Sequence, residues 1–328
     1  MKQKPRHVLV YRLSALGDVA MTIPAIYSCA RRWNEVTFHV VTAAFCSQLF
    51  VNAPANVVLH PVEKTVGTWR LLRDLSKMDI DAVADIHNVL RSWIVDALFL
   101  LKGKRVKMLA KNRDERHAIL KEGKDTKRPF TLRYFDVFEQ LGLSCTSCFS
   151  SLFETLPPLP IDIIKGDEQW IGIAPYARYE NKTYPLEQMH EVVQSLVENP
   201  HNHIFLFGSK GEQAETLKQW QKLSSRVHSV AGCFPLQQEL ALMAHLDVMI
   251  SMDSANQHMA SLVGTRVVSI WGSTTPACGF MGWQQKKEDA VCLHLPCQPC
   301  AIGGSLHCRL NTLDCLKKLS PADIVNIL

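Results

Sequence analysis

The chain has 328 residues, of which 47% are hydrophobic and 20% charged, and its formal net charge is +5. This composition excludes a disordered or low-complexity chain, and the length suits two domains that each bury a core. The apolar runs Val8–Tyr11 and Trp93–Leu101 are too short for a signal-peptide core or a membrane span, so we expect a cytoplasmic protein.

Strand-like and helix-like segments alternate along the first half of the chain. The strand candidates are Val8–Tyr11, Val36–Thr42, Val57–His60, Asp81–His87 and Arg105–Leu109. The helix candidates are residues 19–30, Phe45–Asn52, Thr65–Lys77, Val89–Leu101 and Thr131–Leu141. Such alternation predicts a parallel sheet with helices on both faces.

A segment with three prolines, Glu154–Gly166, is typical of a linker, and the alternation restarts after it. The strand candidates there are Trp170–Ala174, His203–Phe207, Arg226–Val230, Asp247–Ser251 and Arg266–Trp271. The helix candidates are Leu186–Val197, Glu212–Leu223, Leu236–Ala244, Gln257–Leu262 and Ser320–Leu328. The sequence therefore predicts two α/β domains, residues 1–160 and 161–328, that face a central cleft.

Positive charge is concentrated between Lys102 and Arg133, where twelve Lys or Arg stand against four acids. Such a cluster attracts nucleic acid, an anionic membrane face or a phosphorylated substrate. Only Phe130 and Tyr134 interleave with it or follow it, which argues against stacking on single-stranded nucleic acid. A solvated charged face is the alternative interpretation.

Eleven cysteines are unevenly placed. An odd total without an export signal argues against a secreted disulfide framework. Five stand alone and suit small core positions: Cys29, Cys46, Cys233, Cys278 and Cys292. Cys145 and Cys148 form a C-x-x-C pair. The cluster of Cys297, Cys300, Cys308 and Cys315 could supply four thiolates to zinc or form a structural loop.

The first strand is followed by a turn, Ser14–Asp18, at the edge where open α/β sheets bind ligands. Gly17 lets the backbone turn or approach a ligand closely, and Asp18 is the one acid there. Asp18 is a candidate for a reaction centre, and capping of the following helix is the alternative.

Three segments of the second half could meet a phosphate and a sugar. Lys182 lies in a loop after a strand, where a flexible ammonium can neutralise a phosphate. The segment Phe207–Glu212 is a turn that suits nucleoside contacts. Asp253–His258 begins a helix directly after a strand, so backbone N–H groups point at a ligand there. The alternatives are a surface lysine, an Asp helix cap and a core histidine. No G-x-G-x-x-G, Walker loop or H-E-x-x-H is present, which argues against dehydrogenases, P-loop enzymes and zinc proteases.

These landmarks resemble those of glycosyltransferase family 9, the ADP-heptose:lipopolysaccharide heptosyltransferases, which have the GT-B fold of two Rossmann-like domains. The matching residues are Arg12, Gly17, Asp18 and Pro24, then Lys182-Thr183-Tyr184-Pro185, then Asp253-Ser254-Ala255-Asn256-Gln257-His258, then Gly264-Thr265-Arg266-Val267-Val268 and Trp271-Gly272. Tyr184 replaces the family's Trp, Ala255 its Gly and Arg266 its Pro.

The resemblance implies an inverting transfer without a metal or another cofactor. Asp18 would deprotonate the acceptor hydroxyl, and Arg12, Ser14 and Gly17 would belong to the acceptor-side loop. Lys182 would stabilise the departing diphosphate. The implied donor contacts are Glu212 with the nucleoside, Asp253 with sugar hydroxyls, and Ser254, Ala255 and His258 with sugar and phosphates.

The implied partners are an ADP-heptose donor and an anionic, lipid-linked lipopolysaccharide core acceptor at the cytoplasmic face of the inner membrane. The basic stretch Lys102–Arg133 would hold this acceptor and the acidic lipid, and we expect a peripheral enzyme that binds no nucleic acid. Because Ala255 and Arg266 depart from the family pattern, a different nucleotide-sugar donor is an alternative. A catalytically silent nucleotide-sugar binder is another.

Overall fold

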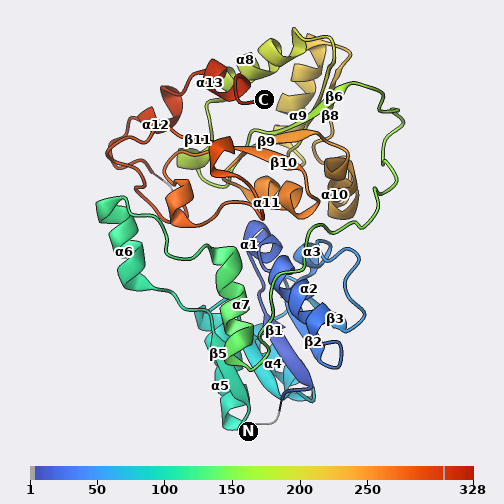
Figure 1. The fold of residues 1–328 in the computed structure, drawn as a ribbon, viewed down its shortest axis with the longest axis vertical. Helices are drawn as coiled ribbons and strands as arrows, with labels where there is room; N and C mark the ends of the chain where they lie inside the picture. Colours follow the sequence, from blue (N-terminus) through green and yellow to red (C-terminus); the bar gives the residue numbers. More distant parts are fainter. Residues whose placement is uncertain (1–3, 306) are drawn as a thin grey trace. The chain divides into compact units, whose positions relative to one another are not determined.

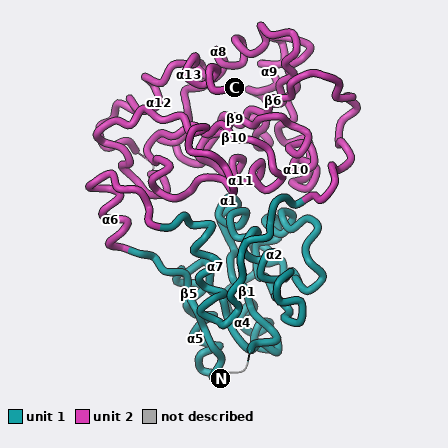
Figure 2. The backbone as a smooth tube through the Cα atoms, in the orientation of Figure 1, with its two compact units in different colours: residues 1–112, 128–152 teal, residues 113–127, 153–328 magenta. Residues whose placement is uncertain are grey.

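The computed structural model describes residues 4–305 and 307–328. The chain divides into two compact units (Figures 1 and 2). Unit 1 comprises residues 1–112 and 128–152, and unit 2 comprises residues 113–127 and 153–328. No helix in the described part of the chain is long and apolar enough to cross a membrane.

Unit 1 is built on a parallel five-stranded sheet with the order β3-β2-β1-β4-β5. Its strands are β1 (His7–Tyr11), β2 (Thr37–Ala43), β3 (Val57–Val62), β4 (Ala82–Asp85) and β5 (Arg105–Met108). Its helices are α1 (Leu16–Ala20), α2 (Ile23–Arg32), α3 (Ala44–Ser47), α4 (Thr68–Ser76), α5 (Leu90–Leu101) and α7 (Phe130–Gln140). The strand order places β1 in the centre, so residues just after β1 lie at the middle of the sheet's carboxyl edge.

Helices cover both faces of this sheet because its strands are apolar on both sides. On one face Leu9 and Val83 of the sheet pack with Val95 and Phe99 of α5 and with α4. On the other face α2 and α7 pack together. There the rings of Phe38 and Phe138 meet edge to face, with centroids 5.8 Å apart.

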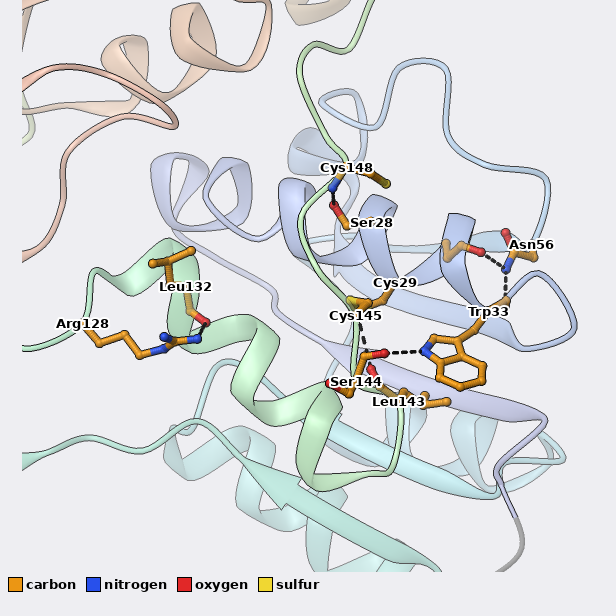
Figure 3. Close-up of a disulfide and its surroundings, with 11 residues drawn as sticks. Ser28, Cys29, Trp33, Asn56, Arg128, Leu132, Leu143, Ser144, Cys145 and Cys148 are labelled. Atoms are coloured by element: carbon orange, nitrogen blue, oxygen red, sulfur yellow. Dashed lines mark hydrogen bonds between the residues drawn. A yellow bond between two sulfur atoms is a disulfide. The ribbon is translucent and has the colours of Figure 1, made fainter.

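A disulfide joins Cys29 of α2 to Cys145, which follows α7 (Figure 3). The expectation that Cys29 is an isolated core thiol is therefore wrong, because α2 and the segment after α7 lie side by side. Two hydrogen bonds fasten the same segment, from Trp33 Nε1 to the Ser144 carbonyl and from the Cys148 amide to Ser28 Oγ, both at 3.1 Å.

Three histidines form a hydrogen-bonded row across β1, β2 and β3. The distance from His7 Nδ1 to His39 Nε2 is 3.2 Å, and that from His39 Nδ1 to His60 Nε2 is 3.0 Å. Burial, with the neighbouring His60 and His7, lowers the pKa of His39 to about 4. His39, at the centre of the row, is therefore neutral near pH 7.

Unit 2 is built on a parallel six-stranded sheet with the order β11-β10-β9-β6-β7-β8. Its strands are β6 (Gln169–Ala174), β7 (Asn202–Leu206), β8 (Val227–Ser229), β9 (Val248–Met252), β10 (Arg266–Ile270) and β11 (Ala290–Val291). Its α-helices are α6 (Arg113–Glu122), α8 (Leu186–Val197), α9 (Glu212–Trp220), α10 (Leu236–Ala244), α11 (Ala255–Leu262), α12 (Asp314–Lys317) and α13 (Pro321–Val325). Its 3₁₀ turns are η1 (Glu180–Lys182), η2 (Gln221–Leu223), η3 (Pro276–Cys278) and η4 (Lys287–Asp289).

The core of unit 2 lies between this sheet and α8, α9 and α13, where Ile171, Val192, Leu217 and Ile324 are buried together. Helix α13 begins as the sequence predicts, because Ser320 Oγ accepts a hydrogen bond from the Asp323 amide at 3.2 Å. Helices α10 and α11 pack against each other and α11 contacts β9 and β10. The sequence prediction of two doubly wound parallel sheets is confirmed.

Residues 113–127 belong to unit 2 although unit 1 precedes and follows them in the chain. The Thr126 amide donates to the Ala277 carbonyl at 2.9 Å, and Lys287 Nζ lies 2.8 Å from Asp125 Oδ2. The basic stretch Lys102–Arg133 is therefore not one surface of a single domain: the structure divides it between both units.

Candidate functional site

Asp18 lies at the carboxyl edge of the first sheet, as the third residue of α1. Its Oδ2 accepts a hydrogen bond from the Ala15 amide at 3.2 Å, so the carboxylate does cap the helix. The same oxygen lies 2.9 Å from Arg12 Nη2. Arg12 is buried, and its Nη1 donates to the Ile86 carbonyl at 2.8 Å. An anchored guanidinium thus holds a carboxylate that keeps 34% of its side chain exposed.

The other two residues of the predicted acceptor-side loop differ in their surroundings. Ser14 is exposed just before α1, as expected for a loop residue. Gly17 is the second residue of α1, and its carbonyl accepts the hydrogen bond of the Met21 amide at 3.0 Å. The turn predicted over Ser14–Asp18 therefore ends earlier, because the helix begins at Leu16.

Polar residues at the end of β4 join this edge, although the sequence pattern did not mark them as site residues. Asp85 is the register partner of Tyr11 across β1 and β4. Burial, followed by the positive charge of Arg12, lowers the pKa of His87 to about 4. Burial raises the pKa of Tyr11 to about 12, and the Tyr11 and His87 rings stack with centroids 6.2 Å apart. The sequence could have indicated them, because Asp85 and His87 lie at the end of the predicted strand Asp81–His87, where ligands of parallel sheets bind.

Asp85 also organises the start of α5. Its Oδ1 accepts the His87 and Asn88 amides at 2.9 and 2.8 Å, and its Oδ2 accepts the Ser92 hydroxyl at 2.6 Å. Burial, followed by the charge of Asp85, raises the pKa of the Asp96 carboxyl to about 8. The Asp96 carboxyl is therefore protonated at neutral pH.

The corresponding edge of unit 2 holds a buried ion pair. Lys182 Nζ lies 2.6 Å from Asp253 Oδ2, and the two side chains are 12% and 4% exposed. Thr274 Oγ1 donates to the same carboxylate oxygen at 2.5 Å, and Gln257 Nε2 donates to Oδ1 at 2.9 Å. Asp253 follows β9, Lys182 ends η1 and Thr274 follows β10, so three segments converge on one carboxylate. Asp253 does not cap α11; it organises the neighbouring loops.

The remaining residues of the Asp253–His258 segment lie at the start of α11. Ser254 is the N-cap residue, with its Oγ 3.3 Å from Ser251 Oγ. Ala255 is the first helical residue, so the position needs no left-handed backbone that only glycine would favour. His258 is buried on the first turns of the helix. The free N–H groups of this turn suit a diphosphate.

The second departure from the family pattern lies away from this edge. Arg266 is the first residue of β10, at the amino end of a strand whose carboxyl end carries Trp271 and Thr274. Its Nη2 lies 2.7 Å from Asp289 Oδ1 and also donates to the Ile327 carbonyl at 2.7 Å. Arg266 therefore has a structural role, because it joins the start of β10 to Asp289 and to the last residues of the chain.

Glu212 opens α9 and is exposed. The preceding Gly211 has a φ of 84°, a left-handed conformation that turns the chain from the loop into the helix. Burial, opposed by a hydrogen bond with Thr216 and assisted by the charge of Glu212, raises the pKa of Tyr176. Tyr176 follows β6 and Glu212 follows the loop after β7, so both belong to the carboxyl edge of this sheet.

The cysteine-rich segment packs against the loop that carries Lys182. Gly304 has a φ of 90°, and a Cβ atom there would lie 2.6 Å from Lys182 Cδ and 2.7 Å from Tyr179 Cδ2. Beside it, Asn181 Nδ2 donates to Ser305 Oγ at 2.7 Å, and the Ser273 amide donates to the Asn181 carbonyl at 2.9 Å. The segment therefore covers the lysine's methylene groups at a distance that only glycine allows.

A cavity of about 320 Å³ opens within the same segment. The four clustered cysteines contribute to its lining: Cys297, Cys300, Cys308 and Cys315. All four are free thiols. Within residues 4–305 and 307–328, no group of three or more His, Cys, Asp or Glu side chains is arranged to hold a metal ion. The four thiols thus line one cavity, and the zinc and structural-loop interpretations of the cluster both stay predictions.

With this geometry established, the comparison with known proteins identifies the family. The profile of glycosyltransferase family 9 (heptosyltransferase) matches residues 68–307. The chain belongs to glycosyltransferase family 9. Lipooligosaccharide heptosyltransferase 2 of Campylobacter jejuni subsp. jejuni serotype O:6 (strain 81116 / NCTC 11828) is 23% identical over 329 residues, which cover 97% of this chain and 96% of that protein.

Solved structures share the fold over nearly the whole chain. ADP-heptose lps heptosyltransferase II of E. coli matches with a TM-score of 0.66 at 16% identity, over 98% of this chain and 97% of that one. Heptosyltransferase WaaC of E. coli, solved with ADP-2-deoxy-2-fluoro heptose, matches with a TM-score of 0.68 at 16% identity, over 98% of both chains. The two parallel α/β units of this family-9 enzyme are thus those of the GT-B fold, as the sequence predicts.

Proposed function

We propose that this family-9 enzyme transfers heptose from ADP-heptose onto a lipopolysaccharide core sugar, with inversion and without a metal. The observation that best supports this proposal is the position of Asp18 at the carboxyl edge of β1. Its Oδ2 lies 2.9 Å from Nη2 of the buried Arg12. It is an exposed acid on an anchored support, as a general base requires. The names of the related heptosyltransferases support the donor and acceptor class.

In the proposed step, Asp18 takes the proton of the acceptor hydroxyl as its oxygen attacks the anomeric carbon of the donor. A new carbon–oxygen bond forms while the bond from that carbon to the β-phosphate oxygen breaks, and ADP leaves with the electron pair. One base and one displacement invert the configuration, through an oxocarbenium-like state. The salt bridge to Arg12 orients the carboxylate toward the incoming hydroxyl.

Unit 2 binds the donor in this proposal. The amides at the start of α11, with Ser254, Ala255 and His258, receive the diphosphate and sugar. Lys182 stabilises the charge that develops on the departing diphosphate. Asp253 positions this ammonium at 2.6 Å and accepts sugar hydroxyls through its Oδ1. Glu212, exposed at the start of α9, contacts the nucleoside.

The acceptor is an anionic, lipid-linked glycan, and the enzyme works as a peripheral protein at the cytoplasmic face of the inner membrane. The charge of +5 and the basic residues of β5 and its flanks support an anionic partner. Aromatic residues are sparse between Lys102 and Arg133, so we do not propose a nucleic-acid ligand.

Calorimetry with ADP-heptose, UDP- and GDP-sugars tests the donor, and transfer onto heptose-deficient lipopolysaccharide tests the reaction. The Asp18→Asn variant should bind the donor normally and lose roughly a hundred- to ten-thousand-fold in kcat. Asp74→Asn, which changes an exposed acid of the same unit, is the matched control. Turnover of Asp18→Asn at the wild-type rate would remove Asp18 from the mechanism.

The same experiments separate the other two interpretations. Transfer from UDP- or GDP-sugar alone would give the chain a different donor, and donor binding without any transfer would make it a silent binder. Ala255 in an ordinary helical backbone and Arg266 in a distant ion pair give no structural reason for a different donor. Undiminished turnover in the presence of EDTA is the outcome expected for metal independence.

A further inference from the structure

The outer face of α5 is apolar along its whole length, unlike that of an ordinary surface helix. At 100° per residue, its exposed residues fall within an arc of about 120°. They are Leu90, Trp93, Ile94, Ala97, Leu100 and Leu101. The helix's two charged residues, Arg91 and Asp96, lie outside this arc: Asp96 is buried, and Arg91 donates to the Val66 carbonyl at 2.8 Å. No polar side chain interrupts the apolar stripe.

A second aromatic side chain is exposed on the neighbouring helix. Trp69 is 84% exposed on α4, and α4 packs against α5 (Figure 1). Both helices belong to unit 1 (Figure 2). Leu101, at the end of α5, is 89% exposed. Side chains of this size are normally removed from water, and a contiguous exposed group of them marks an interaction surface.

Basic residues outnumber acids along α5 and the chain that follows it. From Val89 to Asn112 the chain has six Lys or Arg and a single acid, the buried Asp96. Lys111 Nζ lies 5.0 Å from the centre of the Trp93 ring, so one cation belongs to the apolar face itself. On α4, Arg70 is exposed beside Trp69, and the exposed Arg73 pairs with the neighbouring Asp74 at 3.3 Å.

We propose that this α4–α5 face, defined as the exposed stripe of α5 with Trp69 and its basic flanks, inserts into the headgroup region of an anionic lipid bilayer. Leu and Trp side chains would enter the acyl boundary while the Lys and Arg side chains contact acidic headgroups. This deepens the proposed function, on whose peripheral location it rests: that location was argued from basic residues alone, and the apolar stripe of α5 with Trp69 is added here as the inserting surface.

Charge distribution selects the bilayer over a second copy of the chain. A twofold dimer would bring the same face against itself and would set Lys102, Lys104 and Lys111 of one copy near those of the other. Like charges around an apolar contact weaken such a pairing. An anionic bilayer pairs with the basic flanks and buries the apolar stripe at once.

Flotation of the full chain with phosphatidylcholine vesicles, with and without phosphatidylglycerol, tests this proposal without any donor or acceptor. We expect binding that requires phosphatidylglycerol and weakens with salt. Leu101→Ser should weaken the binding about tenfold, because several buried carbon atoms are lost. Ile164→Ser, at an apolar side chain that is 94% exposed elsewhere, is the matched control and should bind as the wild type does.

Fluorescence provides a second readout that a folding defect does not imitate. Vesicles should shift the tryptophan emission to shorter wavelength, and Trp69→Phe should remove part of that shift while its thermal midpoint stays unchanged. Arg70→Glu should reduce the affinity for anionic vesicles, whereas Lys222→Glu, an exposed charge of unit 2, should not.

The proposal would be overturned by an absence of wild-type binding to anionic vesicles. It would also be overturned by an equal loss of binding in Leu101→Ser and Ile164→Ser. A dimer in sedimentation that Leu101→Ser dissociates while vesicle binding is absent would assign the face to a second copy. Flotation uses neither donor nor acceptor. Vesicle binding without heptose transfer would therefore contradict the proposed function and still support the membrane-binding role of the α4–α5 face.

Discussion

Lys182 and Asp253 form an ion pair with 2.6 Å between Nζ and Oδ2, and both side chains are nearly buried. Thr274 and Gln257 complete the hydrogen bonding of the carboxylate. The pair fixes the loop before α8 to the loop after β9. The Lys182 ammonium, which we propose stabilises the departing diphosphate, is thus held in place by Asp253.

Removal of one partner should destabilise unit 2 strongly. Asp253→Ala leaves the Lys182 ammonium buried without its counter-charge, and we expect a loss of about 3–5 kcal/mol in the free energy of unfolding. Urea denaturation measures this. Asp314→Ala breaks the exposed Lys318–Asp314 pair of the same unit and should cost at most about 1 kcal/mol. Equal losses would show that the buried pair has no special role.

Arg12 should act on turnover through the position of Asp18. Arg12→Gln removes the salt bridge at 2.9 Å, and we expect kcat to fall roughly 10- to 100-fold with little change in donor affinity. Arg12→Lys keeps the charge and loses the two-point hold on Asp18 and Ile86, so its kcat should be intermediate. Steady-state kinetics with donor calorimetry tests this, and a changed donor affinity with an unchanged kcat would contradict it.

Gly304 provides a test of the segment over Lys182. Gly304→Ala forces a Cβ to within 2.6 Å of Lys182 Cδ at a φ of 90°, so it should cost at least about 1 kcal/mol and lower transfer. A Cβ at the neighbouring Gly303 would have no atom within 4 Å, so Gly303→Ala is the control. Thermal unfolding and transfer assays measure both. Equal unfolding temperatures and equal transfer rates in the two variants would show that the packing of Gly304 against Lys182 does not matter.

Acid should weaken the fold through His39. Its folded-state pKa of about 4 is below the ordinary value of 6.5, so the unfolded chain binds the extra proton first. The stability contribution is therefore complete above about pH 6.5 and is lost as the pH falls toward 4. His39→Gln should flatten the dependence of Tm on pH in this window. A slope equal to that of the wild type would contradict the role of His39 in this pH dependence.

The contribution of Asp96 to stability should change with pH in the opposite direction to that of His39. Its folded-state pKa of about 8 is above the ordinary value of 3.8, so the folded chain holds the proton that the unfolded chain releases. Stability is lost as the pH rises between these two values. Asp96→Asn keeps a donor toward Asp85 without a titratable proton, and its Tm should exceed that of the wild type more at pH 8 than at pH 5. A gain that is independent of pH would refute this assignment.

Much of the fold could be predicted because its helices repeat apolar residues at regular spacing. Leu186–Val197 and Leu236–Ala244 agree with the sequence prediction, and a proline precedes each. Helix α6 could not be found this way, because among its ten residues only Ile119 is buried. The continuous helix predicted over residues 19–30 is divided into α1 and α2, because Thr22 is the N-cap of α2 and Pro24 occupies the second position of the new helix.

The candidate site was predictable where its residues are close in sequence. Arg12 with Asp18, and Asp253 with His258, each share one strand-to-helix connection. The Lys182–Asp253 pair and the packing of Gly304 over Lys182 depend on contacts between distant segments. Spacing carries no information about such contacts, so the sequence assigned Lys182 and Asp253 separate roles.

Membership of residues 113–127 in unit 2 has a consequence for synthesis. The ribosome completes unit 1 at residue 152, when α6 has been made but Ala277, which accepts the Thr126 amide, has not. Unit 1 can fold on emerging, whereas α6 has to wait as a tethered, charged loop for most of the remaining translation. A gene truncated after unit 1 would therefore carry an orphaned segment, and separate expression of the units requires this segment to be cut out and supplied to the other half.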